Sequence, residues 1–236
     1  MVSPQPGLHQ PIAEDLWLDS EPMRILGMRL TSSMAIVRLA DGGLLLYSPI
    51  TMTPERRAAV EAIGPVAHLY APNTFHHLRI GDWAEAFPSA RLHAPPGLSK
   101  KRPELRIDRI HPETPEPAFA GILDEIGIEG FRLEESVLVH RPTRTLIVAD
   151  LLHNVGRPED PWSKLYTRAM GFYDRAAMSR MIRWTGFTDR TAARRSLERL
   201  LALPFDRVVV GHGLPIATNG HAAVTAAFAW LPVASG

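Results

Sequence analysis

The sequence predicts a mixed α/β (α+β) fold formed by a single domain. Two apolar stretches with turn residues at their centres, at 34–50 and 135–150, have the pattern of β-hairpins. Apolar strand-like runs elsewhere are followed by segments with helix-start and helix-stop residues. A chain of 236 residues with 45% hydrophobic and 22% charged residues is long and apolar enough to bury a full core.

The first half of the chain alternates strands with short helices. Residues 34–50 are predicted to form a hairpin because Asp41-Gly42-Gly43 accept the positive φ of a tight turn. Thr53-Pro54 predicts a helix start, and Gly64 is expected to end that helix in a left-handed conformation. The segments expected next are a strand at 65–72, a short helix at 81–87, a strand near 90–95 and a proline-rich loop at 95–118.

The second half begins with the hairpin at 135–150, whose turn lies at 141–144 and whose second strand ends at Asp150. Residues 161–202 are predicted to be mostly helical. A buried strand at 205–213 then ends in Gly211-His212-Gly213, and an amphipathic helix closes the chain.

Composition excludes several classes of protein and site. Lysine and arginine (26) balance aspartate and glutamate (25), so no net charge favours nucleic acid or a membrane surface. The chain has no cysteine, which excludes disulfides and thiolate chemistry and leaves histidine, aspartate and glutamate as strong metal ligands. No signal peptide or membrane-spanning run is present, so we expect a cytoplasmic protein.

Residues able to bind a metal follow three of the predicted strands. His76 and His77 come after the first of these strands, Asp150 after the second and His212 after the third. Strand ends at one edge of a sheet face a common cleft, so these side chains are expected to converge. Imidazoles combined with one carboxylate suit zinc or iron(II).

The order of hairpin, helix, strand with histidines, "TLIVAD" and "VVVGHG" resembles the metallo-β-lactamase superfamily. More narrowly, "PNTFHH" and "HRPTRTLIVAD" are similar to a related bacterial and plant family of unknown function. The resemblance implies a four-layer αββα sandwich with a metal site along one edge. It implies an N-terminal arm at 1–24, one domain at 25–236 and a helical insertion at about 157–202.

The superfamily motif HxHxDH is only half present here. If its last two positions fall on His76 and His77, the two earlier histidines are replaced by Pro72 and Thr74, and a third is replaced by Phe131. The resemblance therefore implies one divalent ion, zinc or iron, or no ion at all. The ligands that it implies are His76, His77, Asp150 and His212, with histidine at position 76 where aspartate is usual.

Several of these residues also have structural interpretations. Adjacent side chains diverge, so His76 could orient a ligand instead of binding the ion. Asp150 could cap the segment that follows it. Residues expected to support the ligands are Asn73, His140 and Asn154, whereas His68 and His93 lie in strand patterns and are expected to be structural.

Residues 161–199 carry nine basic and three acidic residues in an almost neutral chain. One interpretation is a basic lid that selects anionic substrates, in which Arg175, Arg180 and Tyr173 contact the substrate. The other interpretation is a solvated helix face.

We expect a metal-dependent hydrolase of a small ester, lactone or phosphoester, including anionic ones, with His76 or His153 transferring a proton. The expected partner is a small-molecule substrate, with no nucleic acid and no membrane. Two alternatives remain open: a non-catalytic module that serves stability or partner binding, and an iron-based redox or sensing protein.

Overall fold

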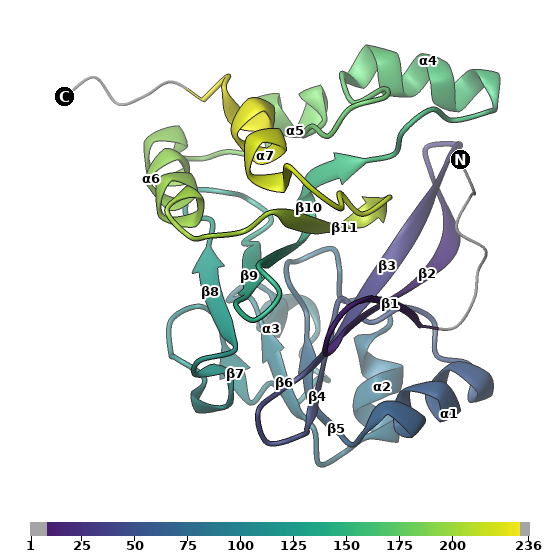
Figure 1. Cartoon of the computed structure of the whole chain (residues 1–236), viewed down its shortest axis with the longest axis vertical. Helices are drawn as coiled ribbons and strands as arrows, with labels where there is room; N and C mark the ends of the chain where they lie inside the picture. The colour runs from purple at the N-terminus through teal and green to yellow at the C-terminus, as the bar shows by residue number, and fades with distance from the viewer. Residues whose placement is uncertain (1–8, 232–236) are drawn as a thin grey trace.

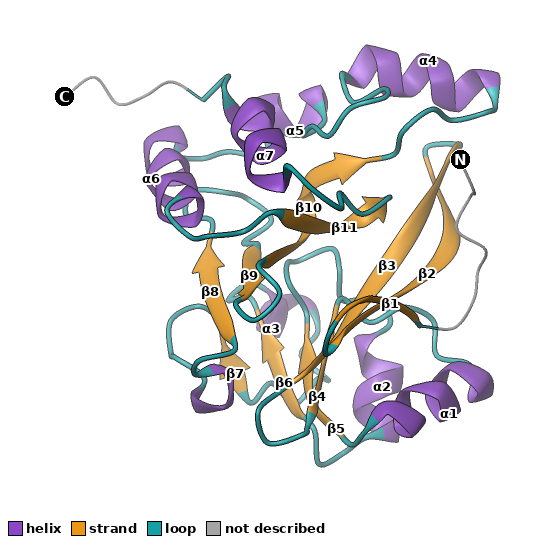
Figure 2. Cartoon of the chain, viewed as in Figure 1, coloured by secondary structure: helices purple, strands orange, loops and turns teal. Residues whose placement is uncertain are grey.

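The computed structural model describes residues 9–231 and shows two β-sheets packed face to face, with helices on both outer sides (Figures 1 and 2). The first sheet has the strand order β1-β2-β3-β4-β5-β6-β7. Its strands are β1 (Gln10–Ala13), β2 (Leu16–Ile25), β3 (Met28–Arg38), β4 (Leu44–Tyr47), β5 (Val66–Tyr70), β6 (Arg91–Ala94) and β7 (Arg109–Ile110). β1 to β4 are antiparallel neighbours, and β4 to β7 are parallel neighbours.

The second sheet has the order β11-β10-β9-β8, in which only β10 and β11 are parallel. Its strands are β8 (Leu123–Gly127), β9 (Ser136–His140), β10 (Thr145–Asn154) and β11 (Arg207–Gly213). The helices are α1 (Pro54–Ile63), α2 (Ile80–Ala86), α3 (Leu98–Lys101), the 3₁₀ turn η1 (Pro117–Phe119), α4 (Pro161–Met170), α5 (Arg180–Thr185), α6 (Arg190–Leu201) and α7 (Gly220–Phe228). No helix within residues 9–231 is long and apolar enough to cross a bilayer.

Three apolar layers hold the four-layer sandwich together and confirm its predicted architecture. The outer face of the first sheet packs against α1 and α2, with Trp83 of α2 fully buried. The inner faces of the two sheets meet in a second layer that includes Tyr47 and Tyr70. The outer face of the second sheet packs against α6 and α7, through residues such as Leu197 and Phe228. Because α6 contributes to this last core, part of the expected insertion at 157–202 is one of the sandwich layers.

The N-terminal boundary is a correction to the sequence prediction. Residues 10–24, expected within an arm outside the domain, belong to β1 and β2, and β2 pairs with β3 along its whole length. The charges of Asp19 and Glu21 obscure the strand pattern in the sequence. In the fold, Arg56 of α1 neutralises them: its Nε lies 2.6 Å from Asp19 and its Nη1 lies 3.3 Å from Glu21. Residues 1–8 lie outside the described part of the chain.

The local signals for α1 are confirmed at its start but not at its end. The Thr53 hydroxyl accepts a hydrogen bond from Arg56 N at 3.2 Å, as an N-cap does. Gly64 has φ 169° and ψ −179°, so the helix leads directly into extended backbone instead of a left-handed cap. This extended residue feeds the chain into β5.

Asp150 lies inside β10, not at its end as the sequence predicts. The pairing of β10 with β11 is regular from Thr145 to Val148 and resumes at His153, with a register shift between them. Such an irregularity re-aims side chains next to functional sites. Asp150 is thus presented from an interrupted part of the strand, and no helix follows for it to cap.

Candidate metal centre

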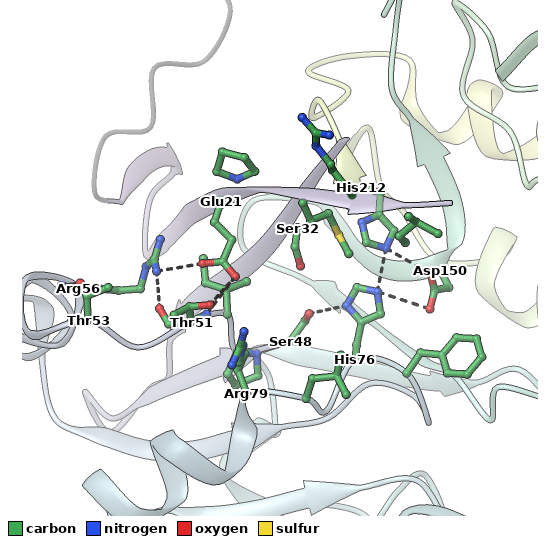
Figure 3. A pocket seen from close by; sticks show the side chains of 18 of the residues that line it. Glu21, Ser32, Ser48, Thr51, Thr53, Arg56, His76, Arg79, Asp150 and His212 are labelled. Carbon is green, nitrogen blue, oxygen red and sulfur yellow. Dashed lines mark hydrogen bonds and ion pairs between the residues drawn. The ribbon is translucent and has the colours of Figure 1, made fainter. Parts of the chain in front are cut away.

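The side chains of His76, Asp150 and His212 point toward one another (Figure 3). The Nε2 atoms of the two histidines are 3.1 Å apart. Asp150 Oδ2 lies 3.4 Å from His76 Nε2, and Asp150 Oδ1 lies 3.4 Å from His212 Nε2. His76 comes from the turn after β5, Asp150 from β10 and His212 from β11, so three distant segments supply the group.

The second nitrogen of each imidazole is already held. His212 Nδ1 is 2.8 Å from the carbonyl oxygen of Thr31. Since a carbonyl oxygen can only accept, Nδ1 carries the proton and Nε2 is left as the coordinating atom of the neutral ring. His76 Nδ1 is 2.7 Å from the Ser48 hydroxyl, which fixes the orientation of that ring. Both Nε2 atoms therefore face the centre, in the arrangement that a metal-binding histidine requires.

Asp150 is held in place by two polar side chains in the interior. The Asn73 amide donates to Asp150 Oδ2 at 3.0 Å and to Glu135 Oε2 at 2.9 Å. Glu135, which is fully buried, accepts hydrogen bonds from the backbone N–H groups of Ala149, Asp150 and Leu151. The Glu135 carboxylate thus holds the interrupted part of β10, and Asn73 links it to the ligand side chain.

Asn73 also shapes the turn that carries His76. Its side-chain oxygen accepts from the backbone N–H groups of Phe75 and His76, both at 2.8 Å. Asparagine commonly closes a turn in this way. One residue therefore contacts both Asp150 and the turn that carries His76.

The pKa values in the group are set by burial and by mutual charge. Burial acts to raise the pKa of Asp150, but His76 and His212 hold it well below its ordinary value. Burial acts to lower the pKa of His212, but Asp150 raises it overall. Burial, followed by the nearby charge of Asp150, raises the pKa of Glu135 to about 7. The carboxylate of Asp150 therefore stays ionised between the two imidazoles, in the state that can bind a metal ion.

Two features of the backbone make room for this group. Ser48 has φ 58°, a left-handed conformation that costs energy in a residue other than glycine and is typical of functional sites. A Cβ at Gly211 would lie 3.0 Å from Ala149 Cα and 3.1 Å from His76 Cε1. Glycine at 211 therefore lets the His76 ring pack against β11, which gives the "GHG" segment a physical role.

The group opens into a cavity of about 730 Å³. Its walls come from β2, the segment after β4, the turn after β5 and α3. Ser48, His76, Asp150 and His212 lie on the wall at one end of this cavity, and Glu21, Thr51 and Arg56 lie on the other side in Figure 3. A small organic molecule fits a cavity of this size.

The structure does not bring His77 into the group. His77 Nδ1 lies 3.2 Å from Nη1 of Arg102, and its side chain is buried away from the cavity. Burial, followed by the charges of Lys101 and Arg102, lowers the pKa of His77 to about 4. Adjacent side chains diverge in this turn, and only His76 faces the centre. Among residues 9–231, the set that converges here is therefore His76, Asp150 and His212.

His153, expected to transfer protons, is buried beside the group and is not among the residues that line the cavity. Its ring stacks on His212 with centroids 5.5 Å apart and contacts Phe172. Burial, followed by His212, lowers the pKa of His153 to about 4. These contacts give His153 a packing role behind His212.

The other two expected supporting residues differ in position. Asn154 donates to the carbonyl oxygen of Leu214 at 2.8 Å and so fixes the chain just after His212. His140 lies at the opposite end of β9, where its Nδ1 is 2.7 Å from the Thr143 hydroxyl. His140 therefore stabilises the hairpin turn and does not contact His76, Asp150 or His212.

Arg175, Arg180 and Tyr173 do not line the cavity, which takes none of its described wall from residues 157–202. Arg175 Nε donates to Gly171 O at 2.8 Å, and Arg180 Nη1 donates to Ala169 O at 3.1 Å. Tyr173 lies under the Arg168 guanidinium at 4.5 Å. These side chains stabilise the connections around α4 and α5, so the basic lid is a correction: the cavity is covered by β2 instead.

Sequence reasoning missed Ser48, Glu135 and the carbonyl of Thr31. Glu135 had a visible signal, because an acidic residue just before the apolar run of β9 (residues 137–139) needs a compensating partner in the interior. Ser48 follows an apolar strand in the same way and precedes a proline. No signal could reveal Thr31, since a backbone carbonyl carries no side-chain identity.

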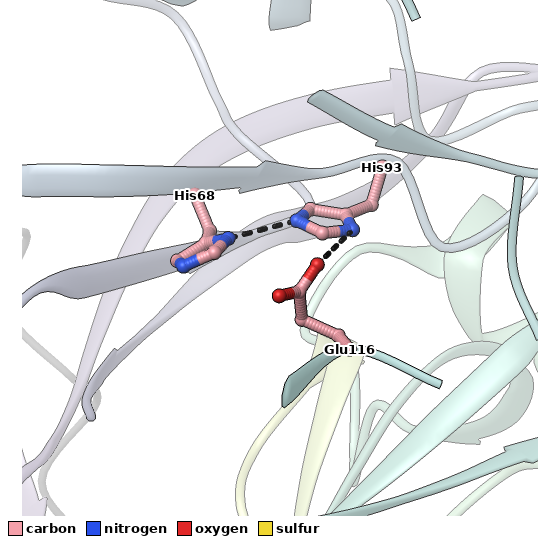
Figure 4. A group of neighbouring side chains, drawn as sticks. All are labelled: His68, His93 and Glu116. Atoms are coloured by element: carbon pink, nitrogen blue, oxygen red, sulfur yellow. Dashed lines mark hydrogen bonds and ion pairs between the residues drawn. The ribbon is translucent and has the colours of Figure 1, made fainter. Parts of the chain in front are cut away.

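A second group with the same residue types lies elsewhere in the fold (Figure 4). His68 of β5 and His93 of β6 are buried between the sheets, with their Nδ1 and Nε2 atoms 2.9 Å apart. Glu116 approaches the other nitrogen of His93 at 4.0 Å. Both histidines were expected to be structural.

A protein family described only as a domain of unknown function (DUF4336) matches residues 14–99, which is less than half of the chain. No curated protein matches the chain in sequence.

Similar solved structures are metallo-β-lactamases. One from Pontibacter korlensis is 13% identical with a TM-score of 0.62, over 92% of this chain and 95% of that one. One from Erythrobacter litoralis is 13% identical with a TM-score of 0.62, over 94% and 96%. The FIM-1 enzyme of Pseudomonas aeruginosa, in its mono-zinc form, is 13% identical with a TM-score of 0.60, over 94% of both chains. The layered sheets and these likenesses together identify the chain as a protein of the metallo-β-lactamase fold.

Proposed function

We propose that this protein is a metal-dependent hydrolase with one divalent ion, zinc or iron, held by His76, Asp150 and His212. The substrate class is a small ester, lactone or phosphoester. This keeps the predicted reaction and replaces the predicted ligand set by one without His77.

One observation carries the proposal: two imidazole nitrogens and a carboxylate converge on one point at the wall of a cavity. The Nε2 atoms of His76 and His212 are 3.1 Å apart, and each lies 3.4 Å from Asp150. Their other polar atoms are occupied by Ser48, the Thr31 carbonyl and Asn73. The donor set is therefore oriented in advance and negatively charged, which fits a divalent cation.

When bound, the ion supplies a Lewis acid that activates water near neutral pH. The chain supplies orientation and shape. Asn73 and Glu135 hold Asp150 as an ionised ligand, and Ser48 presents its hydroxyl at the cavity wall next to His76. His76, Asp150 and His212 would hold the ion at the cavity wall, so the substrate would approach it from the cavity. A three-residue donor set leaves positions for water and substrate, as catalytic sites do.

The experiment measures hydrolysis of 4-nitrophenyl acetate, a γ-lactone and bis(4-nitrophenyl) phosphate by protein loaded with zinc or iron(II). We expect one of these substrate classes to be turned over with a rate that a chelator abolishes and the same metal restores. Asp150→Asn is expected to lower that rate at least 100-fold, because it removes the charged ligand. Glu61→Gln, which removes an exposed carboxylate on α1, serves as the matched control. Equal activity of Asp150→Asn and the control would refute the proposal.

A further inference from the structure

The cavity walls carry a particular pattern of charge. The cationic side chains on the walls are Arg24, Arg56, Arg79 and Lys101. Arg56 is buried and neutralised by Asp19 and Glu21. Lys101 Nζ donates to the carbonyl oxygen of Thr74 at 2.6 Å and lies 5.2 Å from the centroid of the Phe75 ring. These two cations already have partners inside the protein.

Arg24 and Arg79 differ from these two cations. Within residues 9–231, neither guanidinium has an ion pair or a hydrogen bond to another side chain or backbone group. Both are exposed, and both lie on the wall of the cavity that holds the metal centre. In Figure 3 the Arg79 side chain rises from the turn below the cavity, between the Arg56 side and His76. Because neither charge is paired within residues 9–231, both can pair with a bound molecule.

Apolar side chains surround these arginines. Phe75 and Leu78, in the same turn as Arg79, are 57% and 73% exposed. Met23 and Ile25 flank Arg24 on β2. Large apolar side chains exposed on a cavity wall are typical of a binding surface for an organic group. Each of these two wall segments, β2 and the turn after β5, therefore presents apolar side chains next to a guanidinium.

The segment that carries Arg24 is fixed in position. The indole N–H of Trp162 in α4 donates to the carbonyl oxygen of Leu26 at 3.0 Å, at the tip of the β2–β3 hairpin. Ser163 accepts from Arg29 N at 3.0 Å on the opposite strand. The hairpin is thus tied to α4 on both sides of its turn, and this wall of the cavity is already formed.

From these observations we infer that the cavity binds an organic anion, with its carboxylate or phosphate paired to Arg79 and Arg24 and its apolar part on Phe75 and Leu78. A guanidinium binds either oxyanion through two parallel hydrogen bonds, so the two anions share this recognition chemistry. The inference deepens the proposed function, since it assigns the substrate a charged group beyond the bond that is cleaved. Arg79 and Arg24 are then specificity residues of the metal site.

The test uses three probes with the same 2-phenylethyl group: 3-phenylpropanoate, 2-phenylethylphosphonate and the uncharged 3-phenylpropanamide. Binding to zinc-loaded and to metal-free protein is measured by calorimetry at low ionic strength. We expect at least one anion to bind about 10-fold more tightly than the amide, and the stronger of the two identifies the oxyanion. Arg79→Gln should remove most of this preference, and Arg24→Gln a smaller part. Raising the salt should weaken the anion and leave the amide unchanged.

Arg195→Gln is the matched control, because Arg195 is an exposed arginine of α6 without a partner among residues 9–231 and far from the cavity wall. It should leave all three affinities unchanged. Two results would overturn the inference. One is equal binding of the anions and the amide. The other is an anion preference that persists in Arg79→Gln and is lost only when the metal is removed. The second result would mean that the ion alone holds the anion. A preference that survives in metal-free protein but not in Arg79→Gln would support the anion site even if the hydrolase proposal failed.

Discussion

The groups at His76/Asp150/His212 and at His68/His93/Glu116 contain the same types of side chain, and their geometry differs. The closest imidazole nitrogens are 3.1 Å apart in the first group and 2.9 Å in the second. The ring centroids, however, are 4.8 Å apart in the first and 5.1 Å in the second. The rings of the first pair are also more steeply inclined to each other, at 51° against 35°. Both pairs of nitrogens are within hydrogen-bond distance, so the two groups are separated by the charges that surround them.

The charged partners of the two carboxylates, Glu116 and Asp150, also differ. Glu116 lies 2.8 Å from Arg91, and His93 Nδ1 lies 3.4 Å from Nη1 of Arg109. Within residues 9–231, Asp150 has ion pairs only with imidazoles. A buried carboxylate needs a positive partner, and among residues 9–231 the fold supplies arginine in one group and only imidazoles in the other. Residue type alone therefore does not define a metal site; the lack of a guanidinium beside Asp150 separates the first group from the second.

The largest expected effect separates the two carboxylates. Asp150→Asn should lower zinc affinity by at least 100-fold, because it removes the charged ligand while nearly preserving its shape. Glu116→Gln, the matched change in the second group, should leave zinc affinity unchanged. Competition with a chromogenic chelator measures both. An equal loss in Glu116→Gln would mean that the second group also binds the ion.

A smaller effect is expected from the residue that supports Asp150. Asn73→Ala removes the amide that holds Asp150 and the turn of His76, so zinc affinity should fall by about 10- to 100-fold. Thr143→Ala, which removes the hydroxyl bound to His140, is the control at a remote turn. If Asn73→Ala bound zinc as tightly as the control, Asp150 would need no support from Asn73.

The second group is expected to contribute to stability instead. His93→Gln should reduce the free energy of unfolding by about 1–3 kcal/mol, because it leaves buried partners such as His68 without their hydrogen bond. The same variant should bind zinc like the wild type. Urea denaturation in the presence of chelator measures the first quantity. A variant of wild-type stability would indicate that the histidine pair is dispensable.

The pH dependence of the unfolding free energy gives a further test of the second group. Burial, followed by His68 and Arg109, lowers the pKa of His93 to about 2, and burial lowers that of His111 to about 4. Both stay neutral in the folded chain, whereas in the unfolded chain they take up protons near pH 6.5. Their contribution to stability is therefore complete above pH 6.5 and is lost as the pH falls. His93→Gln should reduce the slope of unfolding free energy between pH 6 and 4.5 by about 1 kcal/mol per pH unit. An unchanged slope would mean that His93 is protonated in the fold.

Much of the fold was predictable because its signals are local. The turn at Asp41-Gly42-Gly43, the cap at Thr53 and the apolar run of β10 depend on neighbours in the sequence, and each begins where it was expected, although β10 continues past Asp150 to Asn154. β2 was not predictable, since Asp19 and Glu21 interrupt its pattern until Arg56, more than 30 residues away, neutralises them.

Prediction of the site was limited in the same way, because contacts between distant residues are not visible in the sequence. His76, Asp150 and His212 could be found because each follows or interrupts a strand. Which of His76 and His77 faces the centre depends on the turn that Asn73 closes, and that geometry is not visible in the order of residues. The roles of Arg175 and Arg180 were also out of reach, because their partners are backbone carbonyls.

The most direct test is the number of ions per chain after loading with zinc and dialysis, measured by elemental analysis. The comparison of the two groups predicts one ion in the wild type, one in His68→Gln and none in His212→Ala. Two ions in the wild type, or one that remains in His212→Ala but is lost in His68→Gln, would contradict the assignment of the metal centre to His76, Asp150 and His212.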